Sequence, residues 1–233
     1  MLTSLSNFAD DRFSTLKAAP LGMHRTVQSF SDRRESGAVH GQVLHFAPDG
    51  EIYGDGDDNA SFYKVLSGVV RTCKFRSDGR RQIDAFHLPG EIFGFDAGAS
   101  HRLSAEAVCD CAVVAYRWRA LEAPGEIDDR LAGQFFVYAM QNLQRAQEHS
   151  LLLGRRSAVQ KVAAFLVELA DRAACDHIID LSMARQDIAD YLGLTIETVS
   201  RTLSNLERDA IISLPTARRV CVNNAQALRR ISS

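Results

Sequence analysis

The pattern of hydrophobic and polar positions divides the chain into a first part typical of β-strands and a second part typical of helices. Between about residues 39 and 119, short runs rich in apolar and β-branched residues are separated by glycine and polar residues. These runs cover residues 41–46, 61–66, 69–75, 82–88 and 105–116. Short strands with frequent turn signals are typical of an all-β sandwich or roll.

Four glycines punctuate these runs at intervals of 12, 11 and 11 residues, namely Gly56, Gly68, Gly79 and Gly90. The Asp78-Gly79 dipeptide favours the primed turns that match the twist of two antiparallel strands. We therefore predict a hairpin that joins residues 69–75 to residues 82–88.

After a predicted break at residues 123–125, the period changes to that of a long helix over residues 127–153. One apolar face of this helix would carry Phe136, Met140, Leu143, Ala146, Ser150 and Leu153, and an adjoining face Leu131, Phe135 and Tyr138. Two faces indicate two contacts, one with the β-rich part and one with a second copy of the chain, in a parallel helix pair. The alternative is a single broad face that packs on the protein's own core. Gly154 marks a hinge, and a further amphipathic helix is predicted over residues 157–172.

Residues 185–207 show two short helical periods around a tight turn. Ile188 and Leu192 lie four residues apart on the first helix, Gly193 permits a positive φ at the bend, and Thr195 is a suitable N-cap for the second helix. This order matches a helix-turn-helix.

The second of these helices has an apolar and a polar face. Ile196, Val199, Leu203 and Leu206 share one side, and Glu197, Ser200, Arg201 and Ser204 share the other. Arginine can bond to O6 and N7 of guanine, glutamate can accept from N4 of cytosine, and serine can reach a base or a phosphate. The candidate base-reading residues are therefore Glu197, Ser200 and Arg201, with Ile196 at the start of the helix. The alternative is a surface helix in which Glu197 and Arg201 pair in solvent.

The segment 210–222 reads as two β-runs around a turn that contains Pro215, which indicates a wing. Polar and basic groups near the helix-turn-helix and wing are candidates for contacts with DNA phosphates, namely Thr195, Thr198, Arg185, Ser204, Arg218 and Arg219. The net charge of the C-terminal part has the sign expected for DNA binding. Residues 155–233 hold 11 basic and 9 acidic residues, whereas residues 1–154 hold 16 basic and 20 acidic residues.

The segment 183–201 resembles the helix-turn-helix of the CRP/FNR superfamily of bacterial transcription regulators, and its Glu-x-x-Ser-Arg pattern is similar to the FNR and FixK branches. The segment 88–97, with its Pro-Gly-Glu sequence, resembles part of the cyclic-nucleotide-binding β-roll of that superfamily. The resemblance implies an α+β protein with an N-terminal cyclic-nucleotide-binding-like β-roll (jelly roll), a long dimerisation helix and a C-terminal winged helix-turn-helix. The implied divisions are an arm at 1–28, the β-roll at 29–125, the dimerisation helix at 126–154 and the DNA-binding domain at 155–233.

The implied function is a homodimeric regulator that binds double-stranded DNA at an inverted repeat. Arg201 matches the family arginine that reads the guanine of TTGA-type half-sites. If the protein is an activator, RNA polymerase is a further partner. No enzymatic activity is expected.

The sequence departs from the family at the residues that hold known effectors. Phe95 follows Gly94 where cyclic-AMP-binding members have glutamate for the ribose, and Leu103 follows Arg102 where they have serine for the phosphate. The first 72 residues contain no cysteine, whereas FNR holds iron–sulfur in an N-terminal cysteine cluster. We therefore expect no cofactor. The alternative is the same architecture switched by a small ligand or haem in the β-roll.

The composition also limits which other classes of protein the chain can belong to. No run approaches the length of a membrane span and no secretory signal is visible, so we expect a cytoplasmic protein without membrane contact. Five cysteines without regular spacing argue against a disulfide framework, and Cys109 and Cys111 are expected on one strand face as structural thiols. A cupin-type metalloenzyme is a remote alternative, because the chain lacks a His-x-His pair with suitable partners.

Overall fold

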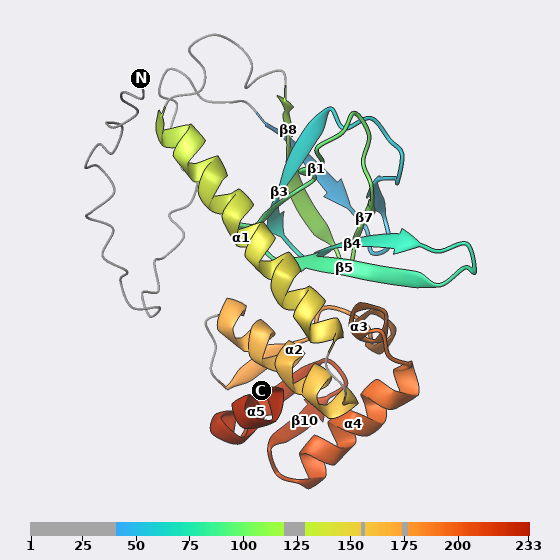
Figure 1. Ribbon diagram of the computed structural model, residues 1–233, viewed down its shortest axis with the longest axis vertical. Coiled ribbons are helices and arrows are strands. Elements are labelled where there is room, and N and C mark those ends of the chain that lie inside the picture. Colours follow the sequence, from blue (N-terminus) through green and yellow to red (C-terminus); the bar gives the residue numbers. More distant parts are fainter. Residues whose placement is uncertain (1–40, 119–128, 155–156, 174–176) are drawn as a thin grey trace, which may run out of the picture. The chain divides into compact units, whose positions relative to one another are not determined.

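Eight strands form two four-stranded sheets in the first half of the chain (Figure 1). The computed structural model describes residues 41–118, 129–154, 157–173 and 177–233, with side chains of the long helix from residue 136 onward. One sheet has the order β1-β8-β3-β6 and the other β2-β7-β4-β5. The strands are β1 Gln42–Phe46, β2 Glu51–Tyr53, β3 Ser61–Ser67, β4 Val70–Phe75, β5 Arg81–His87, β6 Ile92–Phe93, β7 Ser104–Ala107 and β8 Cys111–Arg117. The predicted β-roll is confirmed.

The predicted glycine turns are present, since Gly56, Gly68, Gly79 and Gly90 all have positive φ. The backbone N–H of Gly79 donates to the carbonyl of Arg76 at 2.9 Å, which closes the hairpin between β4 and β5. At Gly68 a side chain is also excluded by space, because a Cβ atom would lie 2.4 Å from the carbonyl oxygen of Asp110.

The sequence prediction was wrong over residues 105–116, which form two strands rather than one. The chain turns at residues 108–110, between β7 and β8. Strand β7 therefore pairs with β2 and β4, whereas β8 pairs with β1 and β3. Cys109 therefore lies in the turn and does not share a strand face with Cys111. The short strands β2 and β6 were not predicted.

The second half of the chain contains five helices and a three-stranded sheet within the described residues (Figure 1). Their bounds are α1 Asp129–Leu153, α2 Ala158–Ala173, β9 Ile178–Asp180, α3 Arg185–Leu192, α4 Ile196–Arg208, β10 Ile212–Thr216, β11 Arg219–Val222 and α5 Ala225–Ser232. The helix predicted at 127–153 is confirmed from Asp129, and the predicted wing is the β10–β11 hairpin. Strand β9, which completes the wing sheet, and helix α5 were not predicted. The predicted arm at 1–28 and break at 123–125 lie outside the described residues.

The buried apolar residues join the β-roll to the C-terminal helices. One cluster lies inside the roll around Val65, Val70 and Val113. A larger cluster combines Ile83 and Phe86 of β5 with buried residues of the C-terminal helices and wing. Such shared burial is the main source of stability for the contact between the two halves. All the described residues accordingly belong to one compact unit.

None of the helices in the described ranges is both long enough and apolar enough to span a bilayer.

Candidate nucleic-acid interface

Local capping fixes where the first helix of the predicted helix-turn-helix ends and where the second begins. Helix α3 ends at Gly193, which has a φ of 61°, and the Gly193 N–H donates to the carbonyl of Ala189. Helix α4 begins at Ile196 and is capped by Thr195, whose hydroxyl oxygen accepts from the N–H of Thr198 at 3.2 Å. These two contacts satisfy backbone groups that a helix end otherwise leaves without partners. The predicted turn glycine and N-cap are both confirmed.

Helix α4 separates its apolar and polar residues as predicted, with one exception. Val199, Leu203 and Leu206 are buried, while Glu197, Ser200, Arg201 and Ser204 are exposed. The exception is Ile196, which is 37% exposed instead of packing with the other apolar residues. Ile196 is the first residue of α4, and its role as a base reader stays a prediction.

Three of the candidate phosphate ligands, Arg185, Thr195 and Thr198, lie around the starts of α3 and α4. Thr195 and Thr198 contact each other through their hydroxyl oxygens at 3.0 Å at the amino end of α4. A helix amino terminus carries partial positive charge and favours anions. Arg185 opens α3 and is partly buried, and this burial lowers its pKa. Its Nη1 is buried and has no hydrogen-bond partner among the described residues.

The two wing arginines differ in their contacts. Arg219 is bound to Asp180 of β9, with Nε at 2.7 Å from one carboxylate oxygen and Nη2 at 3.3 Å from the other. These hydrogen bonds lower the pKa of Asp180. Arg218 lies in the β10–β11 turn and makes a longer contact of 3.4 Å with the carbonyl of Ser182. Arg218 is therefore the better candidate for a phosphate contact, because Arg219 would have to give up Asp180.

The long helix α1 has one apolar face exposed and one packed. Phe136, Met140, Leu143 and Leu153 of the predicted dimer face are 66%, 47%, 50% and 36% exposed. Ala146 and Ser150 are exposed as well. Tyr138 packs against Phe62 and Ile92 of the β-roll, as predicted for the adjoining face, whereas the side chains of Leu131 and Phe135 lie outside the described set.

Two further exposed apolar residues of α1 were not part of the predicted face. Val137 is 52% exposed and Leu151 is 73% exposed. Contiguous exposed apolar surface on a soluble protein is typical of an interaction site.

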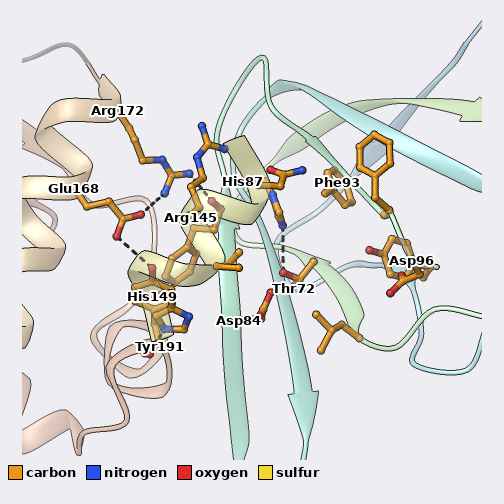
Figure 2. A pocket seen from close by; sticks show the side chains of 18 residues that line it. Thr72, Asp84, His87, Phe93, Asp96, Arg145, His149, Glu168, Arg172 and Tyr191 are labelled. Carbon is orange, nitrogen blue, oxygen red and sulfur yellow. Dashed lines mark hydrogen bonds and ion pairs between the residues drawn. The ribbon is translucent and has the colours of Figure 1, made fainter. Parts of the chain in front are cut away.

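A pocket of about 230 Å³ lies where the β-roll, α1, α2 and α3 meet (Figure 2). Phe95 and Leu103, the residues that replace the polar groups of cyclic-AMP-binding members, both line it. Many of its polar side chains bond to one another, as Figure 2 shows for Arg172, Glu168 and Tyr191 on one side and Thr72 and His87 on the other. Burial lowers the pKa of His87 to about 3, so this imidazole is neutral at physiological pH.

Thiols and metal ligands give little further chemistry. Burial raises the pKa of both Cys73 and Cys111 to about 11, which keeps them as unreactive thiols. Cys221 is partly buried, and Cys175 lies outside the described residues. Within the described ranges, no group of three or more His, Cys, Asp or Glu residues is arranged to hold a metal ion.

Comparison with known proteins supports both halves of this description. Residues 43–123 match the cyclic nucleotide-binding domain, and residues 160–231 match the Crp-like helix-turn-helix domain. The nitrogen fixation regulation protein FixK of Azorhizobium caulinodans is 50% identical over 201 residues, covering 84% of this chain and 81% of that protein. FixK of Rhizobium meliloti is 42% identical over 189 residues, covering 81% of this chain and 86% of the relative.

A solved structure gives the same result. That of FixK2 from Bradyrhizobium japonicum matches with a TM-score of 0.78 and 42% identity, covering 83% of this chain and 98% of that chain. The chain therefore belongs to the CRP/FNR family of DNA-binding transcription regulators, in its FixK-like branch.

Proposed function

We propose that the protein is a homodimeric transcription regulator that reads a TTGA-type inverted repeat through α4. The observation that carries this proposal is the exposed face of α4, where Glu197, Ser200 and Arg201 follow a capped amino terminus. Arginine, glutamate and serine at the start of a recognition helix supply the donors and acceptors that distinguish base pairs in the major groove.

Dimerisation follows from the geometry of DNA. One helix-turn-helix contacts few base pairs, whereas a two-fold dimer reads two half-sites one helical turn apart. The exposed apolar residues of α1, among them Phe136, Met140 and Leu143, supply the surface that a second copy would cover.

We infer activation as the regulatory outcome, with RNA polymerase as the further partner. A relative from Rhodopseudomonas palustris, 39% identical over 175 residues, is the transcriptional activatory protein AadR. A transcription assay with purified polymerase on a promoter that carries the inverted repeat tests this inference, and repression in that assay would contradict it.

DNA binding is expected without an added small molecule, and a titration of the purified protein checks it. Phe95 and Leu103 line the pocket, and an apolar side chain cannot make the hydrogen bonds that the ribose and phosphate of a cyclic nucleotide need. A protein without an effector must occupy its DNA-competent state unaided, because a ligand shifts that equilibrium only through unequal affinity for the two states. The nucleotide-free and metal-free protein should therefore bind a TTGA-type inverted repeat tightly and selectively under reducing conditions.

The same titration distinguishes the second candidate function, a regulator switched by a small ligand or haem. The pocket of about 230 Å³ is the observation that favours it. Absorption spectra and the native mass of the protein are measured first, to determine whether a haem, cluster or nucleotide is bound. Selective binding that appears only after addition of a cyclic nucleotide, haem or metal would replace the proposal by this alternative.

Replacement of Arg218 by alanine should weaken binding by a similar factor on all DNA sequences. A phosphate contact does not depend on the identity of the base. Each lost contact makes the fall of log K with log salt concentration less steep by about 0.9. The magnitude of this slope should thus decrease by about 0.9 for each subunit of the dimer. Titrations between roughly 50 and 200 mM salt measure it. A loss confined to one base pair of the site would contradict the assignment, and Arg80→Ala, an exposed arginine in the β4–β5 turn, serves as a control for bulk charge.

A further inference from the structure

Two arginines of the β4–β5 hairpin contact the first helix of the helix-turn-helix. Arg71 of β4 donates from Nη1 to Asp187 at 3.3 Å. Arg81 of β5 donates from Nη2 to the same carboxylate and from Nε to Asp190 at 2.9 Å. Asp187 and Asp190 lie about one turn apart on α3, so both face the hairpin. We call Arg71, Arg81, Asp187 and Asp190 the interdomain cluster.

The interdomain cluster is largely shielded from water. The side chains of Arg71 and Asp187 are each 6% exposed, and those of Arg81 and Asp190 are 16% and 14% exposed. Glu106 of β7 also contacts both arginines, so three shielded carboxylates share two guanidinium groups. Burial opposes the charge on Arg71, but its hydrogen bonds to Asp49 and Glu106 and the charge of Asp187 raise its pKa. In such surroundings, loss of one guanidinium leaves carboxylates without a counter-charge.

Asp187 links these contacts to the geometry of the DNA-reading helix. Its second carboxylate oxygen accepts from the N–H of Ala184 at 3.0 Å and so caps α3. Helix α3 packs on α4 through buried residues that include Ile188 and Val199. A displacement of α3 from the hairpin would therefore carry α4 with it.

A second carboxylate ties the same parts of the chain together beside the pocket. Glu91 of the β-roll accepts from Arg145 of α1 at 3.0 Å and from Arg172 of α2 at 2.9 Å. Its Oε2 also accepts from the backbone N–H of Leu88 at 3.0 Å, which fixes the carboxylate on the roll. The carboxylate of Glu91 thus connects the β-roll to both α1 and α2.

We propose that the interdomain cluster positions the helix-turn-helix for DNA, with Arg81 and Asp190 as positioning residues that act through α4 without touching a base. This inference rests on the proposed function as a dimer that reads two half-sites. Two recognition helices must be spaced by one turn of DNA, so freedom of α3 relative to the roll lowers the fraction of competent dimers. The apparent dissociation constant rises as that fraction falls.

Arg81→Gln tests the proposal, since it removes the charge while keeping a long polar side chain. We expect about tenfold weaker binding to the inverted repeat, corresponding to a competent fraction reduced to about one tenth. The preference among base-substituted sites should stay as in the parent, because no base contact is lost. Asp190→Asn should give a smaller loss of the same kind, and the double variant should lose less than the product of the two single effects, because the two residues contact each other.

Arg80→Gln is the matched control. It removes the same charge from the neighbouring position of the hairpin, where the side chain is 83% exposed and lies 3.7 Å from Asp78. DNA affinity of this variant should equal that of the parent. Thermal unfolding of each variant identifies loss of folding, and if Arg81→Gln unfolds, Asp190→Asn supplies the test.

A distance measurement separates this inference from the proposed function. Spin labels at the exposed residues Ser77 and Asp209 are introduced as noncanonical amino acids, in mixed dimers with one labelled chain, without DNA. The distance distribution should be narrow in the parent and broad in Arg81→Gln. A parent that binds no inverted repeat would refute the proposed function, with the distances still testing the cluster. Parent-like affinity or parent-like distances in a folded Arg81→Gln or Asp190→Asn would overturn the positioning role.

Discussion

Replacement of Arg201 by alanine should weaken binding to the preferred half-site by about 1–3 kcal/mol and remove the preference for guanine at one base pair. Arg201 is exposed on α4, one turn after Glu197 and next to Ser200, on the side opposite the buried Val199 and Leu203. A guanidinium there can donate to both O6 and N7 of guanine, and no other base pair offers these two acceptors in the same place. Binding titrations on a set of half-sites substituted at each position measure the change.

Arg208→Ala is the matched control for this prediction. Arg208 lies two turns further along α4 and is also exposed, so its loss removes the same charge. Because base contacts come from the amino-terminal part of a recognition helix, the Arg208 variant should keep the base preference of the parent. The same series should show Glu197→Ala altering preference at a different base pair. If Arg201→Ala were as selective as the parent, Arg201 would not read a base.

The helix-turn-helix could be predicted from the sequence because its determinants are local. Gly193 has a φ of 61°, which favours glycine, and Thr195 caps α4 through its own side chain. Each residue type therefore predicts the local backbone conformation directly. The period of Val199, Leu203 and Leu206 gives the buried face in the same way. Ile196 was misplaced because the first turn of a helix can extend beyond the core that buries the later turns.

The β-roll was predictable in outline but not in detail. Strands β2 and β6 contain three and two residues and exist because they pair with β7 and β3. A run of that length has no period of its own, so its structure is set by the neighbouring strand. The turn at residues 108–110 was missed for a related reason, since apolar residues on both sides of it made one long run.

The interdomain cluster could not be found from the sequence. Arg81 and Asp187 are 106 positions apart, and charged residues at this separation show no periodic relation. The sequence around each residue is typical of a solvent-exposed charged side chain. The two residues meet through tertiary packing, in which Ile83 and Phe86 of β5 share a core with the C-terminal helices.

Leu143→Asp should convert the dimer into monomers and abolish tight binding to the inverted repeat. Leu143 is 50% exposed in the single chain, on the face of α1 that also presents Phe136 and Met140. In the proposed dimer a carboxylate there would be buried near its symmetry mate, which costs on the order of 3–5 kcal/mol when a buried charge has no partner. That cost corresponds to a rise of roughly 10²–10⁴-fold in the dimer dissociation constant.

Sedimentation of the parent and the variant across a range of concentrations measures this change, and Gln141→Asp is the control. Gln141 is exposed on α1 but points well away from Leu143, because two residues along a helix are about 200° apart. The control adds the same charge to the same helix, so it should remain dimeric and bind DNA as the parent does. A parent that sediments as a monomer at DNA-binding concentrations would refute the dimer. An unaffected Leu143→Asp dimer would instead show that subunits join through another surface, for which the exposed Val137 and Leu151 are the next residues to replace.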